Sequence, residues 1–148
     1  MTRDPRQPLS AGTRIASYRI DSVLGAGGAA ITYAATNMVV HRRVAIKEYL
    51  PIGLAQRASD RIDVSAVPGR IQEFAKGLEA FVGEAKALAS FRHPAVAPIE
   101  HYIQTNGTAY VVMPYVEGET LAAVLRARGR LTHAEVEALL PALLDALA

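Results

Sequence analysis

Two stretches decide the fold of this chain: Leu24-Gly25-Ala26-Gly27-Gly28-Ala29-Ala30 and Val44-Ala45-Ile46-Lys47-Glu48-Tyr49. Residues 18–24 and 31–36 flank the glycines and are rich in β-branched and aromatic side chains, which predicts strand, loop and strand. Residues 44–49 predict a third strand for the same reason. The glycine cluster therefore lies between two predicted strands, where small residues let backbone N–H groups approach an anion.

The middle of the chain is predicted to leave the sheet and return to it. Residues 51–69 carry prolines, glycines and mixed charge without periodicity, which predicts a long loop with at most one short helical turn. From Ile71 apolar residues recur at three- and four-residue spacing, which predicts an amphipathic helix that ends before His93-Pro94.

Two more strands are predicted at residues 97–104 and 108–113, with Asn106-Gly107 as the tight turn between them. The expected fold class is therefore α+β, with an antiparallel sheet of about five strands and one packed helix.

The two ends of the chain differ from the middle. Residues 1–14 are rich in proline and charge, and we expect a flexible leader with order beginning near Ile15. Residues 120–128 predict a short helix stopped by Gly129, and Thr132 with Glu135 predicts a capping box at the start of another helix. That helical pattern runs to the last residue without a stop signal, so we expect a truncated chain. Pro141 is expected to bend this helix.

Composition excludes several classes of protein. The 148 residues are 51% hydrophobic, enough for one core, and 16 basic and 14 acidic side chains are scattered, so no nucleic-acid partner is expected. Cysteine is absent, which excludes disulfides and thiolate nucleophiles, and the four histidines lack a metal-binding spacing, so no metal ligands are expected. Neither a secretory signal nor a membrane-spanning segment is evident, so a cytoplasmic location is expected.

Lys47 and Glu84 are the candidate catalytic residues. Alternation along a strand puts Ala45 and Lys47 on one face, where the small residue leaves room for a flat ring and the cation can reach phosphates. Glu84 lies on the predicted helix and could pair with Lys47. Each feature alone has a plainer explanation: a solvated lysine, a solvated glutamate or an ordinary glycine turn. Their combination favours a nucleotide site.

In this order the motifs resemble the small lobe of the protein kinase family. The resemblance is carried by Leu24-Gly25-x-Gly27, Val44-Ala45-Ile46-Lys47, the Glu84 helix ending in Phe91-Arg92-His93-Pro94, and Val111-Val112-Met113-x-Tyr115-Val116-Glu117-Gly118. The run from Val44 to Pro51 looks especially like bacterial serine/threonine kinases. The resemblance implies a small lobe over residues 15–116, followed over 117–148 by the hinge exit and the first helices of a helical large lobe.

The resemblance also implies a role for each site residue. Lys47 would hold the α- and β-phosphates of ATP, with Glu84 as its partner. The remaining nucleotide contacts would come from Leu24, Gly25, Gly27, Gly28, Thr32, Ala45, the gatekeeper Met113, and the hinge backbone at Pro114 and Val116. Ala29 and Ala30 depart from the family's aromatic residue and third glycine, and a positive φ at Ala30 would weaken phosphate binding.

The function implied is the ATP-binding part of a kinase that transfers the γ-phosphate of Mg·ATP to Ser or Thr of a protein substrate. No His-Arg-Asp or Asp-Phe-Gly segment occurs, so the fragment is expected to be inactive alone, with the magnesium ligands in a missing lobe. One alternative is a pseudokinase or regulatory module that binds nucleotide or protein without catalysis.

A second alternative is a dinucleotide-binding oxidoreductase, because Gly25-x-Gly27-x-x-Ala30 fits its fingerprint and Glu48 follows at the distance of a ribose ligand. That fold requires a helix directly after the glycines. The strand formers Ile31-Thr32-Tyr33 stand there instead, which argues against it.

Overall fold

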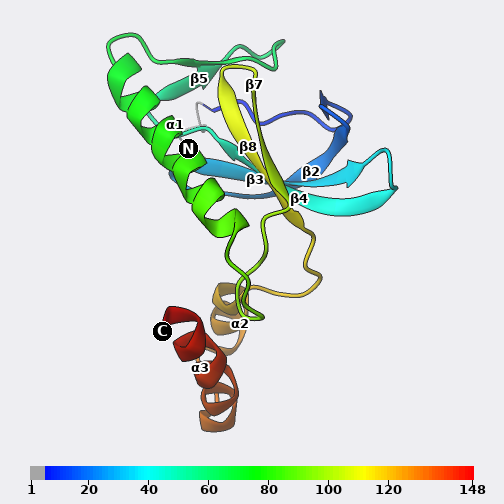
Figure 1. Cartoon of the computed structure of the whole chain (residues 1–148), viewed down its shortest axis with the longest axis vertical. Coiled ribbons are helices and arrows are strands. Elements are labelled where there is room, and N and C mark those ends of the chain that lie inside the picture. Colours follow the sequence, from blue (N-terminus) through cyan, green and yellow to red (C-terminus); the bar gives the residue numbers. More distant parts are fainter. Residues whose placement is uncertain (1–5) are drawn as a thin grey trace.

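The computed structural model describes residues 6–148 and contains one large antiparallel sheet with a long helix packed along it (Figure 1). The sheet has the strand order β1-β2-β3-β4-β8-β7, and a second sheet pairs β5 with β6. The strands are β1 (Arg14–Ile15), β2 (Tyr18–Ala26), β3 (Ala30–Asn37), β4 (Arg42–Tyr49), β5 (Ala55–Arg57), β6 (Val64–Ala66), β7 (His101–Thr105) and β8 (Thr108–Pro114). The helices are α1 (Ile71–Ala89), α2 (Leu121–Arg128) and α3 (His133–Leu147). The predicted α+β class is confirmed.

One face of the large sheet carries the main core. Alternation along β4 buries Val44, Ile46 and Glu48 and leaves Lys47 exposed on the other face. The core also takes in residues from outside the sheet: Leu9, Ala55, Val64 and Phe74. This face is therefore closed by the N-terminal segment and the β5–β6 hairpin, whereas α1 packs against Tyr49 and Val111, which lie on the face of Lys47.

Helix α1 is held to the end of β4 by Tyr49. Its ring lies 5.3 Å from that of Phe74 and 5.5 Å from that of Phe81, and its hydroxyl donates to the Phe74 carbonyl at 3.2 Å. A Cβ atom at Gly77 would lie 2.0 Å from this hydroxyl. Glycine disfavours a helix interior, so its presence here follows from the close approach of Tyr49.

The expected loop at residues 51–69 contains one helical turn, in which the Ala55 N–H donates to the Pro51 carbonyl at 3.1 Å, but it also contains the β5–β6 hairpin, which the sequence pattern does not predict. Three-residue strands are too short to show a period of two. The hairpin is tied to the β7–β8 turn, where the Val64 N–H donates to the Asn106 carbonyl at 2.8 Å. Asn106 and Gly107 have φ of 55° and 73°, which confirms the predicted turn.

The expected strand at residues 97–104 begins later than predicted, at His101. Pro98 lies in the part that is not a strand, and proline has no N–H to donate to a ladder.

The N-terminal segment differs most from expectation. Residues 6–13 pack against the sheet, with Arg6 and Leu9 buried and the Gly12 N–H donating to the Ile20 carbonyl at 2.7 Å. The expectation that order begins near Ile15 is therefore wrong. The segment shows no periodicity in sequence, because its buried residues Arg6 and Leu9 are held by contacts with distant residues such as Gly27 and Tyr33. The first five residues of the expected leader lie outside the described residues.

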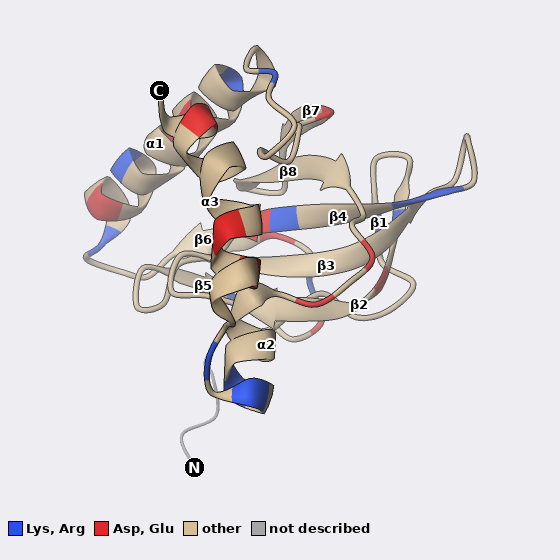
Figure 2. Cartoon of the chain, turned by 90° about the horizontal axis from the view of Figure 1, so that it is seen from below, with Lys and Arg blue, Asp and Glu red and all other residues tan. Residues whose placement is uncertain are grey.

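Helices α2 and α3 follow the sheet and lie beyond one end of α1 (Figure 1). Thr132 and Glu135 form the predicted capping box, and Gly129 ends α2 with φ of 77°. Within residues 6–148 no helix is both long and apolar enough to cross a membrane. Figure 2 shows basic and acidic positions spread over helices and strands, in keeping with the scattered charge of the sequence. The expected lobe boundary at residue 116 stays a prediction.

Candidate functional site

Lys47 lies in the middle of the sheet, on its open face. It is paired with Thr32 on β3 and with Val111 on β8, and Thr32 is paired with Gly25 on β2. Cross-strand partners project to the same side of a sheet. The register therefore places Lys47 in one row with Gly25, the first glycine of the glycine-rich turn that also contains Gly27 and Gly28 (the glycine loop).

A second row lies beside the first and carries small side chains. Ala45 is paired with Ala34 on β3 and with Met113 on β8. Because Ala45 and Lys47 are two residues apart, they share a face, as alternation predicts. A shallow apolar floor thus lies next to the lysine.

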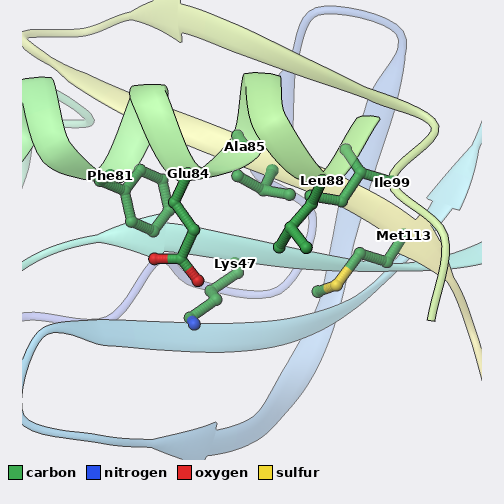
Figure 3. Close-up of a pocket in the computed structure, with 8 residues that line it drawn as sticks. Lys47, Phe81, Glu84, Ala85, Leu88, Ile99 and Met113 are labelled. Atoms are coloured by element: carbon green, nitrogen blue, oxygen red, sulfur yellow. The ribbon is translucent and has the colours of Figure 1, made fainter. Parts of the chain in front are cut away.

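A cavity of about 70 Å³ opens between this face and α1 (Figure 3). It is lined by Lys47, Phe81, Glu84, Ala85, Leu88, Ile99, Val111 and Met113. Sites for small molecules usually measure hundreds of Å³. This cavity, called the recess below, is therefore smaller than a usual small-molecule site.

Glu84 extends from α1 toward the end of the Lys47 side chain in Figure 3. Both side chains are exposed, and the ion pairs of the described residues do not include one between them. The two elements therefore bring both charges to the same recess without forming an ion pair. The predicted pairing of Lys47 with Glu84 stays a prediction.

The glycine loop joins β2 to β3 and is exposed. Gly25, Gly27 and Gly28 are not among the described glycines with positive φ. An added Cβ atom would meet nothing within 4 Å at Gly25 or Gly28, and only the Ala30 carbonyl at 3.9 Å at Gly27. Neither backbone conformation nor packing requires glycine here. What the glycines provide is open access to the backbone.

Ala30 is not strained. Among the described residues other than glycine, positive φ occurs only at Ala16, His41 and Asn106. Ala30 begins β3 and is buried. The condition under which its methyl group would weaken phosphate binding is therefore not met.

The predicted hinge residues follow one another from the end of β8. Met113 and Pro114 are half-buried, and Val116 is 74% exposed. The Arg43 guanidinium lies 4.0 Å from the centre of the Tyr115 ring, a cation–π contact that joins β4 to the hinge. Apart from the pair Arg42-Arg43, no local pattern in the sequence predicts this contact. Leu24, at the edge of the site on β2, is 48% exposed.

Glu48 lies on the opposite face of β4 and is fully buried. It forms an ion pair with buried Arg57, and the Tyr33 hydroxyl donates to its carboxylate at 2.7 Å. Burial raises the pKa of the Glu48 carboxyl, and Arg57 and Tyr33 oppose that rise. A side chain enclosed in this way cannot bind a ribose, which removes the oxidoreductase alternative.

Comparison with known proteins identifies bacterial kinases that are similar to this chain in sequence and in structure. It is 33% identical over 119 residues to the serine/threonine-protein kinase PknJ of Mycobacterium tuberculosis, covering 80% of this chain and 17% of PknJ. It is 30% identical over 138 residues to the serine/threonine-protein kinase PrkC of Bacillus subtilis, covering 93% of this chain and 18% of PrkC. Among solved structures, PpkA-294 in its apo form matches with a TM-score of 0.87 and 33% identity, over 95% of this chain and 50% of that one.

None of the protein-family models compared with the chain matches it. The chain spans about a fifth of the length of these two kinases and half of the solved chain. The matches to PrkC and PpkA-294 cover 93% and 95% of this chain, so each includes the glycine loop, the sheet and α1. This chain therefore carries the N-terminal lobe of a protein kinase of the bacterial serine/threonine family.

Proposed function

We propose that this chain binds ATP as the N-terminal lobe of a serine/threonine protein kinase. The observation that carries the proposal is the row formed by Gly25, Thr32 and Lys47, next to the small residue Ala45 on the same open face. A flat ring fits over Ala45 while the lysine reaches the phosphates of the same ligand.

In this proposal each strand contributes one part of the site. Lys47 contacts the α- and β-phosphates, and Glu84 orients it after a small movement of α1. Leu24, Thr32 and Ala45 flank the adenine. The Pro114 carbonyl accepts from the adenine amino group, a role that the missing N–H of proline does not affect, and the Val116 N–H donates to the ring.

Phosphoryl transfer to Ser or Thr of a protein is proposed for the whole protein, not for these 148 residues. The sequence contains neither His-Arg-Asp nor Asp-Phe-Gly, and no group of three or more metal-ligating side chains occurs among residues 6–148. Magnesium would accompany the nucleotide as its phosphate complex, and its protein ligands would lie outside this chain.

A thermal-shift titration tests the proposal. Wild type, Lys47→Ala and the control Lys76→Ala are melted with increasing Mg·ATP, since Lys76 is an exposed lysine on α1 away from the recess. A ligand at 100 times its Kd stabilises a protein by about 2.7 kcal/mol. We expect this stabilisation for wild type and Lys76→Ala, and an affinity at least about tenfold weaker for Lys47→Ala, because a hydrogen bond to a charged group is lost.

Equal shifts for the two lysine variants would place the nucleotide elsewhere, and no shift at millimolar ATP would reject the proposal. Full affinity in a whole protein that has no kinase activity would favour the pseudokinase alternative.

A further inference from the structure

The tip of the glycine loop is held from outside. Its three successive carbonyls, at Gly27, Gly28 and Ala29, accept hydrogen bonds from three groups beyond the loop. The donors are the Arg6 guanidinium at 2.5 Å, the Ile52 N–H at 2.9 Å and the Leu50 N–H at 3.0 Å. Two of these donors are backbone groups just after β4. The third is a side chain from the N-terminal segment.

Arg6 is 3% exposed, and its guanidinium also donates to the Leu50 carbonyl at 3.2 Å. One buried cation therefore bridges the glycine loop and the end of β4. Charged groups are buried only where polar partners offset the loss of water. Two backbone carbonyls are among the partners of Arg6, and one of these belongs to the glycine loop.

Residues 6–9, the strap, are fixed by contacts of their own. Leu9 packs into the main core, and its N–H donates to the Tyr33 hydroxyl at 3.0 Å. Arg57 donates to the Gln7 carbonyl at 2.5 Å while it pairs with Glu48. The strap is thus anchored to the same buried network that lies behind Lys47. Arg6 extends from this anchored segment to the loop.

Peptide geometry connects this contact to the site. The Gly27 carbonyl and the Gly28 N–H belong to one planar trans peptide and point in opposite directions. Holding the carbonyl toward buried Arg6 turns the N–H of exposed Gly28 away from the strap, toward the open side of the loop. We propose that Arg6 is a positioning residue that fixes the glycine loop with its Gly28 N–H turned toward the nucleotide phosphates. The last step rests on the proposed function.

The experiment compares wild type, Arg6→Ala, Arg6→Lys and Arg14→Ala, the last being an exposed arginine at the start of β1 that controls for charge. Amide hydrogen exchange is measured without nucleotide, and ADP affinity by calorimetry. Loss of a hydrogen bond changes such equilibria about fivefold. In Arg6→Ala we expect the Leu50 and Ile52 amides to exchange about fivefold faster and ADP to bind about fivefold more weakly. Arg6→Lys keeps the charge and serves as the test variant if Arg6→Ala does not fold. Its exchange rates and ADP affinity should lie between those of wild type and those expected for Arg6→Ala.

Exchange of the amides in the middle of β4 serves as the reference for global stability. The faster exchange in Arg6→Ala must therefore be confined to the glycine loop and to the Leu50 and Ile52 amides. Loop exchange equal to that of Arg14→Ala would overturn the inference, and so would faster exchange with unchanged ADP affinity. If wild type binds no ADP, the proposed function fails. Exchange at Leu50 and Ile52 then still decides whether Arg6 holds the loop.

Discussion

Lys47 and Glu48 are neighbours in β4, and they lie in opposite environments. Lys47 is exposed on the face that carries the glycine loop and the small residues. Glu48 is fully buried on the other face, paired with Arg57 and hydrogen-bonded by Tyr33. One step along a strand thus separates the proposed ligand contact from the most enclosed charge of the sheet.

This difference between the two faces of the sheet predicts which substitutions affect stability and which affect binding. The buried face is closed by the strap and the β5–β6 hairpin, so substitutions there should affect stability. The open face has a floor of small side chains and charges without ion-pair partners at the recess, so substitutions there should affect binding. The faces meet at the glycine loop, where Arg6 crosses from the buried side.

The largest effect is expected when the buried face loses its cation. Arg57→Met removes the charge but keeps most of the apolar stem, and leaves Glu48 as an unpaired buried carboxylate. Breaking a buried ion pair from one side costs about 3–5 kcal/mol. Urea unfolding monitored by circular dichroism should show a loss of this size at neutral pH.

The stability that Arg57→Met loses should depend on pH, and the sign of this dependence can be predicted. Burial already raises the pKa of Glu48, and removing Arg57 removes the first of the influences that oppose the rise. A folded-state pKa above the unfolded value of about 4.3 means that the folded state binds the proton more tightly. The loss of stability should therefore be smallest near pH 4 and grow toward pH 7. A loss independent of pH would mean that Glu48 is not left charged and unpaired.

Leu9→Ala is expected to have the next largest effect. Leu9 is buried in the main core, and truncating a buried leucine costs about 2–5 kcal/mol. The strap lies at the edge of the core, so about 2 kcal/mol is expected. Chemical unfolding measures the loss, and Leu121→Ala, an exposed leucine at the start of α2, is the control. If the two variants lose the same stability, the strap is not part of the folded core.

Gly77→Ala tests how closely α1 packs against Tyr49, because the added methyl group would meet the Tyr49 hydroxyl. Overpacking costs about 1–3 kcal/mol, and the higher helix propensity of alanine returns up to about 1 kcal/mol. We expect a net loss of about 1 kcal/mol. Gly83→Ala on the same helix meets nothing within 4 Å and should gain stability from propensity alone. A gain for both variants in thermal unfolding would show that Tyr49 does not limit the approach of α1.

Local signals predicted the parts of the fold that are built locally. The bounds of α1, the Asn106-Gly107 turn and the Thr132 capping box each follow from a few consecutive residues. Alternation also predicted that Ala45 and Lys47 share a face.

Contacts between distant segments could not be predicted in this way. Arg6 meets the loop 21 residues away, and Arg57 meets Gln7 across 50 residues. Both arginines lie in proline-containing stretches that the sequence predicts to be irregular, where arginine is usually exposed, so nothing local marks these two as buried. The position of α1 against the sheet sets the distance between Glu84 and Lys47. That position depends on the close approach of Tyr49 to Gly77, which are far apart in the sequence.

The smallest effect on stability is expected at the residue placed at the centre of the proposed site. Lys47→Met is the counterpart of Arg57→Met, since each exchanges a long cation for the same apolar side chain. Lys47 is exposed and has no ion pair among those of the described residues, so the free energy of unfolding should change by no more than about 0.5 kcal/mol. The same urea titration measures it. A loss of several kcal/mol would mean that Lys47 supports the fold, and weaker nucleotide binding in a lysine variant could then no longer be assigned to a lost phosphate contact.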